Sequence, residues 1–262
     1  MLPYDAAGLW NKKEHIVVPE KYLTTVRALL DHLEHTQLPA VEQAAAVIVD
    51  ALRHGGCVYC SGIGHGLEGD FINRAGGLAA VQPLAFGFTL NDPVADCRKD
   101  RPRAEPFERD LETVRFALRA STLRAGDVLL VGSVSGRNRA PVELALRARE
   151  MGVRVIAITS LAYTARVDSM HPSGKKLAEV ADVVVDNGAP YGDAAVAIDG
   201  LPEKMIPVSG VGTLAAGWMI WGRVMERMAQ EGTPPSVYIS VNREGGQAFY
   251  DKSKAEYHRR GY

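Results

Sequence analysis

The 262-residue chain lacks a strong net charge, a disulfide framework and a long apolar run, and each absence argues against a class of protein. The formal net charge of −1 gives no electrostatic reason to expect nucleic acid or a membrane surface as a partner. Three cysteines are too few for a disulfide scaffold. The stretch closest to a membrane span, residues 208–219, is short and is interrupted by serine, threonine and glycine. No basic segment followed by an apolar one opens the chain, so we expect no secretory signal and a cytoplasmic protein.

The cysteines and histidines do not form a recognisable metal or redox centre. Cys57 and Cys60 have the C-x-x-C spacing of redox proteins, but that chemistry needs cysteines at the start of a helix, where the thiolate is stabilised. Here they lie in an apolar run that predicts a strand, so we interpret them as buried and unreactive. No histidine–carboxylate cluster has ligand spacing, so we expect no bound metal.

The chain is organised around residues 127–160. The run 128–131 is apolar and rich in β-branched side chains, which predicts a strand buried on both faces. A polar turn follows at residues 133–138, and apolar residues then recur at helical spacing as far as Gly152. Residues 153–158 predict a second buried strand. Strand, helix and strand within this length indicate a parallel pair joined by a right-handed crossover.

The turn at residues 133–138, called the serine turn below, has the composition of an anion site. Gly136 permits a tight bend, and the turn leads into a helix whose first N–H groups are unpaired and carry partial positive charge. No acidic residue lies between positions 133 and 140. The polar and basic residues here are Ser133, Ser135, Arg137, Asn138 and Arg139. The pattern therefore predicts that this turn binds a phosphate group.

The serine turn, its helix, Gly152 and the strand ending at Thr159-Ser160 together resemble the SIS (sugar isomerase) domain. Members include phosphoheptose isomerase and N-acetylmuramic acid 6-phosphate etherase, and the similarity runs from about Val41 to Asp186. The resemblance implies an α/β fold: a three-layer αβα sandwich around a mainly parallel five-stranded sheet, Rossmann-like in type. It also implies the residues that bind the phosphosugar: Ser133, Ser135, Gly136, Arg137, Asn138, Thr159 and Ser160. Asn138 stands where the family usually has threonine.

A glycine-rich turn after the strand predicted at residues 57–61 is the second part of the resemblance. In the family it closes over the phosphate through backbone N–H groups, which implies contacts from Gly62 and Gly64. The same turn satisfies the G-x-G-x-x-G pattern of dinucleotide sites. That interpretation requires an acidic residue at the end of the next strand, and residues 79–84 end without one. We therefore reject NAD and expect no cofactor.

Three residues are candidates for acid–base chemistry. Moving a proton between adjacent sugar carbons needs a base, and Glu68 follows the glycine turn, although a carboxylate is also favoured in the first turn of any helix. His65 lies within the glycine turn, where contact with a ligand is expected. His171 lies in a loop at the ligand-binding end of the sheet, with a structural hydrogen bond as the alternative role. We expect Glu143 and Glu150, on the central helix, to lie at the surface.

The remaining segments complete a chain that we interpret as one domain, residues 1–262, with a helical extension at about 1–40 and another extension at about 200–262. Further helices are predicted at residues 20–33, 39–52, 111–123, 174–180 (capped by Ser173) and 205–228, and further strands at 183–185 and 236–241. Residues 86–109 predict a loop or lid. Residues 242–262 predict a tail that packs on a partner subunit. The first two helices are expected either to form a dimer interface or to cover the sheet.

The preferred interpretation is a phosphosugar-binding protein that acts as an aldose–ketose isomerase. The alternatives are a non-catalytic phosphosugar sensor and a phosphosugar lyase or etherase. The resemblance implies a homodimer or a dimer of dimers, with the sites near the subunit interface. A regulator in this family carries a basic DNA-binding module, and the segment before Val41 is too short and insufficiently basic for one.

Overall fold

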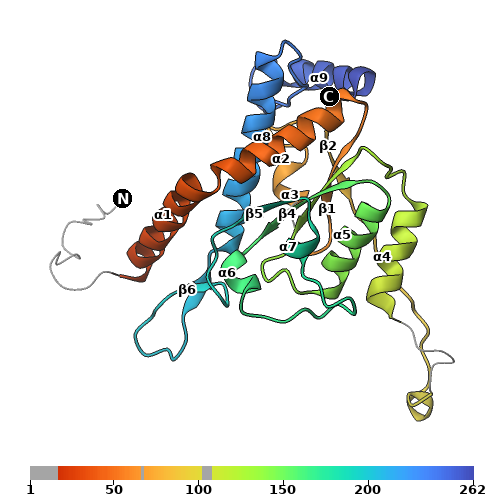
Figure 1. The fold of residues 1–262 in the computed structure, drawn as a ribbon, viewed down its shortest axis with the longest axis vertical. Coiled ribbons are helices and arrows are strands. Elements are labelled where there is room, and N and C mark those ends of the chain that lie inside the picture. Colours follow the sequence, from red (N-terminus) through yellow and green to blue (C-terminus); the bar gives the residue numbers. More distant parts are fainter. Residues whose placement is uncertain (1–16, 66–67, 102–107) are drawn as a thin grey trace, which may run out of the picture.

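The computed structural model describes residues 17–65, 68–101 and 108–262 (Figure 1). In these ranges a five-stranded parallel sheet has the strand order β2-β1-β3-β4-β5. The strands are β1 (Val58–Ser61), β2 (Val81–Leu84), β3 (Val128–Gly132), β4 (Arg154–Thr159) and β5 (Val183–Asp186). This confirms the predicted α/β class and the parallel pair formed by the two central strands.

The central strands are buried on both faces, as their apolar sequences predict. Val128 and Leu130 of β3 contact one apolar cluster, whereas Leu129 and Val131 contact another, because successive side chains of a strand point to opposite faces. All four are fully inaccessible to solvent. Helices α2 (Leu38–Arg53) and α8 (Ser209–Gln230) cover the first face; α4 (Arg109–Ala120), α5 (Arg139–Glu150) and α7 (Leu177–Val180) cover the second. The three-layer sandwich is confirmed.

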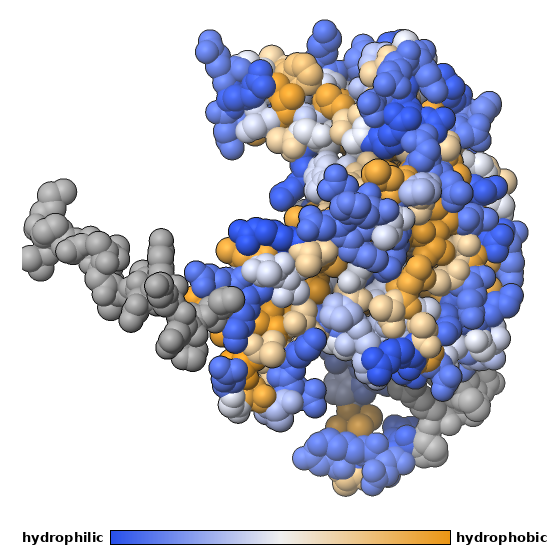
Figure 2. Space-filling model, turned by 60° about the vertical axis from the view of Figure 1, so that its left-hand side comes forward, coloured by the Kyte–Doolittle hydropathy of each residue, from blue (hydrophilic) through white to orange (hydrophobic). Residues whose placement is uncertain are grey.

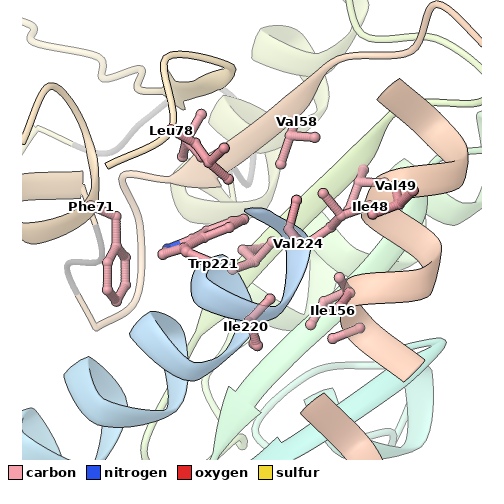
Figure 3. Close-up of a cluster of buried hydrophobic side chains, with 14 of the residues drawn as sticks. Ile48, Val49, Val58, Phe71, Leu78, Ile156, Ile220, Trp221 and Val224 are labelled. Carbon is pink, nitrogen blue, oxygen red and sulfur yellow. The ribbon is translucent and has the colours of Figure 1, made fainter. Parts of the chain in front are cut away.

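The larger apolar cluster joins α2 and α8 to the sheet. In Figure 3, Phe71 lies beside Trp221 of α8. Further along α8, Val224 lies near Ile48 and Val49 of α2. The Phe71 and Trp221 rings meet edge to face with centroids 6.0 Å apart. Such a layer of large, fully buried side chains supplies most of the free energy that holds a helix on a sheet.

Helix α1 (Val18–Thr36) lies against α8 and the hairpin of β6 (Ala194–Val196) and β7 (Met205–Pro207). Leu29 and Leu33 are buried, whereas Leu23 is 50% and Leu30 41% exposed. Apolar side chains accordingly reach the surface on the face that carries α1 (Figure 2). None of the helices in the described ranges is long and apolar enough to cross a membrane.

The remaining elements are α3 (Glu68–Phe71), the 3₁₀ turn η2 (Asp96–Arg98), α6 (Leu161–Thr164) and α9 (Gly246–Arg260). In the described part of residues 86–109, regular secondary structure is limited to η2 and the first residue of α4, which agrees with the predicted loop. Cys60 lies fully buried in β1, as expected.

The predicted helix 205–228 is wrong at its start. Residues 205–207 form β7, antiparallel to β6, and α8 begins at Ser209 and continues without a break through Gly210 and Gly212. The start is fixed by Asp193, whose carboxylate accepts the backbone N–H groups of Val208 and Ser209 (3.1 and 2.8 Å). A carboxylate at this place satisfies N–H groups that a helix leaves unpaired. Sequence periodicity alone does not reveal a cap from a distant loop.

One further prediction near the carboxyl terminus is wrong. Residues 236–241 form no strand; they make one isolated bridge, between Val237 and Leu78. Residues 242–262 contain α9, which packs on its own chain through Tyr257 and Tyr262, and packing of this segment on a partner subunit stays a prediction. The helix predicted at 174–180 is shorter, because α7 begins at Leu177 and Ser173 does not cap it.

Candidate functional site

A pocket of about 310 Å³ opens at the carboxyl end of β1 and β3, where parallel sheets of this type place their ligands. Its floor is the serine turn, which connects β3 to α5. The lining residues are Gly64, His65, Ser133, Val134, Ser135, Asn138, Tyr163, Gly192 and Asp193. The structure thus brings the two predicted turns together around one space.

Five successive carbonyl groups of the serine turn, residues 133–137, are hydrogen-bonded to groups behind it. The donors, in order, are Thr159 Oγ1 (2.6 Å), Ser160 N (2.9 Å), Thr164 Oγ1 (3.0 Å), Leu177 N (2.8 Å) and Met170 N (3.0 Å). The N–H of a trans peptide points opposite to the carbonyl of the same peptide plane. Fixing these carbonyls therefore turns the following N–H groups to the other side, where the pocket lies.

The N–H groups of Val134, Ser135, Arg137 and Asn138 have no acceptor among the described residues. Three of these four residues line the pocket. The first N–H groups of α5 are also unpaired, and Asn138 makes no side-chain cap to them. Unpaired N–H groups that converge at a helix amino terminus bind anions, because each carries partial positive charge and the helix dipole adds to it.

Side chains of the turn add uncommitted donors. The hydroxyls of Ser133 and Ser135 and the amide of Asn138 make no hydrogen bond to any described residue, and all three residues line the pocket. Arg137 has no carboxylate partner in the described part of the chain, although its side chain does not line the pocket. Arg139, expected to add charge, instead pairs with Glu108 and Asp110 (2.6 and 2.7 Å).

Glycine is required at two positions for the turns to meet. Gly136 has φ +63°, and a Cβ there would lie 2.9 Å from Thr164 Oγ1 and 3.0 Å from Thr159 Oγ1. Gly64 has φ +95°, and a Cβ would collide with the carbonyl oxygen of Gly132. Both conformations are costly for other residues. The glycines therefore permit the close approach of the loop after β1 to the serine turn.

Other predicted ligand residues lie elsewhere. Thr159 and Ser160 are fully buried: the Thr159 hydroxyl binds the Ser133 carbonyl, and the Ser160 hydroxyl donates to Ala189 O (2.6 Å). They shape the serine turn from behind rather than facing the pocket. Gly62 donates its N–H to Leu84 O and does not line the pocket. Of the acid–base candidates, His65 lines the pocket, while the side chain of Glu68 lies outside what the structure describes.

His171 does not line the pocket, and both of its ring nitrogens have partners inside the protein. Nε2 lies 2.8 Å from Glu143 Oε2, and Nδ1 lies 2.8 Å from Ser173 Oγ. The geometry therefore favours the alternative role considered for His171, a structural hydrogen bond.

The prediction that Glu143 lies at the surface is wrong, because its side chain is completely inaccessible. Its Oε1 accepts from Arg115 Nε (2.5 Å) and Arg147 Nε (3.0 Å). Burial alone would raise the pKa of Glu143, but the hydrogen bonds from Arg115, His171 and Arg147 outweigh it and hold the pKa below its ordinary value. Glu150 is exposed, as expected.

Sequence reasoning did not single out Tyr163, Gly192 and Asp193, which form the far wall of the pocket. Tyr163 packs on Tyr191 with ring centroids 5.0 Å apart, and Arg166 lies over the Tyr191 ring. The carboxylate of Asp193 is occupied at the start of α8, where Oδ2 also accepts the Ser209 hydroxyl (2.6 Å). The available signal was position, since these residues follow β4 and β5 at the ligand-binding end.

Among the described residues, no group of three or more His, Cys, Asp or Glu side chains is placed to hold a metal ion. The titratable side chains that line the pocket are His65, Tyr163 and Asp193. The Asp193 carboxylate is engaged by α8, whereas the His65 ring makes no hydrogen bond to a described residue.

Comparison with known proteins places this architecture in a family. Residues 21–160 match the SIS domain. A UPF0309 protein of Listeria innocua is 33% identical over 237 residues, covering 88% of this chain and 94% of the relative. A UPF0309 protein of Streptomyces coelicolor is 31% identical over 239 residues, covering 90% and 94%.

Solved structures with a similar fold include a phosphoheptose isomerase from Francisella tularensis, with a TM-score of 0.49, 16% identity, and coverage of 79% of this chain and 95% of that one. The sugar isomerase domain of an RpiR transcription factor from Sphaerobacter thermophilus gives a TM-score of 0.46 and 18% identity, with coverage of 92% and 97%. On the sequence matches, this chain belongs to the UPF0309 family of SIS-domain proteins.

Proposed function

We propose that this protein binds a phosphorylated sugar in the pocket and interconverts its aldose and ketose forms. The observation that carries the proposal is the serine turn, whose carbonyls are all tied to the protein while four N–H groups are left unpaired. The free hydroxyls of Ser133 and Ser135 add two neutral donors beside them. Such a site favours an anion with several acceptor oxygens, and a phosphate monoester fits that description.

The sugar then extends from the serine turn toward His65, Tyr163 and Asp193, which form the rest of the lining. In an aldose–ketose isomerisation a base removes the proton from the carbon next to the carbonyl, and an acid protonates the carbonyl oxygen. The base then gives the proton to the former carbonyl carbon of the resulting enediol, while the hydroxyl on the neighbouring carbon loses its proton and becomes the new carbonyl. We assign His65 to proton transfer at oxygen and propose Glu68, which follows it at the start of α3, as the carbon base.

Binding is tested first, by thermal shift of the purified protein against hexose, heptose and amino-sugar phosphates and the corresponding free sugars. A ligand that binds only the folded state raises the melting temperature by mass action. Stabilisation by a phosphosugar and not by its parent sugar is the expected result. No stabilisation by any phosphosugar, or equal stabilisation by the free sugars, contradicts the phosphate assignment.

Turnover is tested next, by incubating the stabilising phosphosugar with the protein in D₂O and following deuterium incorporation beside the carbonyl by NMR. Proton exchange with solvent reports enediol formation even where the equilibrium hides net conversion. The isomerase is supported if the wild type exchanges this proton for deuterium and His65→Gln slows the exchange about 100-fold while binding is retained. Binding without exchange identifies a sensor instead, and release of a substituent identifies a lyase or etherase.

We also propose that the protein is a homodimer or a dimer of dimers. The support is the outer face of α1, where Leu23 and Leu30 lie seven residues apart on one side of the helix and are about half exposed. Exposed leucines at this spacing are typical of a helix that packs on a second helix.

A further inference from the structure

We propose that His171 is a positioning residue for the phosphate site: it holds the loop of residues 165–176 against the serine turn and thereby fixes the direction of the phosphate-binding N–H group of Asn138. The inference rests on the proposed function, because it concerns how well the same turn binds phosphate. His171 itself lies outside the pocket lining and acts through the main chain of Met170.

The loop 165–176 has a single buried side chain, and that side chain is His171. Every other residue of the loop is exposed or half-buried, including the apolar Met170, which is 51% exposed. His171 is 7% exposed and contacts the fully buried Glu143 of α5. Apolar packing therefore does not fix the middle of this loop, and one polar side chain anchors it.

The hydrogen bonds define the tautomer of His171. The Ser173 backbone N–H donates to Nδ1 (3.1 Å), so Nδ1 is an acceptor and carries no proton. The proton of the neutral ring therefore lies on Nε2, which donates to Glu143 Oε2 (2.8 Å). Glu143 is itself held by Arg115 of α4 and Arg147 of α5, so the acceptor is rigid. His171 thus joins the loop to the helix whose amino terminus forms the phosphate site.

The loop contacts the serine turn next to this anchor. The N–H of Met170, adjacent to His171, donates to the Arg137 carbonyl (3.0 Å). This carbonyl belongs to the peptide plane that carries the N–H group of Asn138. The neighbouring Gly136 carbonyl is held separately, by the N–H of Leu177 (2.8 Å), which is buried at the start of α7. Release of the loop therefore frees the plane of the Asn138 N–H to rotate, which removes one preorganised donor without a change in the pocket lining.

The test compares two substitutions at this position. His171→Leu keeps the approximate volume and removes the donor to Glu143, whereas His171→Gln keeps an N–H donor near the position of Nε2. A control, Asp127→Asn, perturbs an equally buried side chain that accepts the N–H groups of Cys57 and Arg124 just before β3, at the opposite end of the sheet from the pocket. Melting temperatures of all variants are measured, and binding is compared at a temperature where each is folded.

The probe is inorganic phosphate, titrated while the backbone amide signals of Arg137 and Asn138 are followed by NMR. We expect these signals to move in the wild type, the dissociation constant to rise at least about tenfold in His171→Leu, and His171→Gln and Asp127→Asn to stay within about threefold of wild type. Wild-type affinity in His171→Leu overturns the positioning role and leaves the proposed function intact.

Equal weakening in Asp127→Asn attributes the loss to general destabilisation and overturns the inference. Equal weakening in His171→Gln overturns the assignment to the Glu143 hydrogen bond. Absence of any phosphate-induced shift in the wild type overturns the proposed function and this inference together.

Discussion

The hydroxyl of Thr159 donates a 2.6 Å hydrogen bond to the backbone carbonyl of Ser133, from the end of one central strand to the end of its neighbour. Thr159 is fully buried, so this hydroxyl meets the protein and not a ligand. The contact begins the series of five that draws the carbonyls of the serine turn inward. A residue expected to bind the phosphate directly instead shapes the proposed phosphate site.

Thr159→Val keeps the side-chain shape and removes this donor. We expect a loss of about 1–2 kcal/mol in the free energy of unfolding, because a buried hydrogen bond disappears, and weaker phosphosugar binding. Thr213→Val is the matched control: it removes a buried hydroxyl in the second turn of α8 that accepts from Asn187 (3.1 Å) and makes no hydrogen bond with the serine turn. Denaturant unfolding and ligand titration measure both effects. Unchanged ligand affinity in Thr159→Val would falsify the role given to this contact.

Gly136→Ala is expected to abolish phosphosugar binding. The left-handed conformation costs about 1–2 kcal/mol for alanine, and the new Cβ crowds the hydroxyls of Thr164 and Thr159 that hold the turn. Gly232→Ala is the control, since Gly232, after the end of α8, also has positive φ (+74°) but no atom within 4 Å of the added Cβ. Both variants should lower the melting temperature, and only the first should lose binding by calorimetric titration. Normal binding by Gly136→Ala contradicts the site.

Glu143 is expected to give the protein an acid-sensitive stability. Its pKa is lower in the folded state than its ordinary value of 4.5, so the stabilisation is complete above that value and is lost as the pH falls through the folded pKa. Glu143→Gln should lower the melting temperature at neutral pH by roughly 5–10 °C, since Arg115, Arg147 and His171 lose a charged partner. The gap between the melting temperatures of wild type and variant should narrow as the pH falls below 4.5 and through the lowered pKa of the folded state. A gap that is constant from neutral pH to pH 3 excludes this linkage.

The proposed dimer is tested on α1. The double substitution Leu23→Glu and Leu30→Glu places two charges on its exposed face and leaves Leu29 and Leu33, which pack on the same chain, unchanged. Light scattering should report monomers, because carboxylates are costly to bury at an interface. Leu90→Glu, at a leucine that is 61% exposed elsewhere, is the control. If the double variant remains dimeric, α1 does not form the dimer interface and only covers the core of its own chain.

The sequence predicted the sheet well because each strand is marked by its own local sequence. The central runs at 128–131 and 153–158 are apolar and flanked by turn residues, and the structure has β3 and β4 there. Elements whose existence depends on a distant partner were predicted poorly. The β6–β7 hairpin is absent from the predictions, and the start of α8 is set by Asp193, sixteen residues before Ser209.

The candidate site shows the same division between features marked by local sequence and features that depend on distant contacts. Composition drew attention to the serine turn, and Ser133, Ser135 and Asn138 line the pocket. The family resemblance placed Thr159 at the ligand, and the helical pattern placed Glu143 at the surface; both residues are buried instead, because the direction of a side chain depends on packing that a sequence pattern does not contain. Glu143 in particular follows Pro141 at the start of an ordinary amphipathic helix, and only the fold brings Arg115 and His171 to it.

The carbonyl groups of the serine turn are held from behind by residues 159–177. The opposite walls of the pocket come from the loops after β1 and β5, together with Tyr163 of α6. Apart from Tyr163, the residues that orient the turn and the residues that face the rest of a ligand thus lie in separate stretches of the chain. Exchange of residues near His65 or Gly192 alters the shape offered to the rest of a ligand and leaves every contact that orients the turn in place. Chains with this arrangement are able to diverge in what they accept while inheriting the same anchor, and an engineer can graft new loops onto it without rebuilding it.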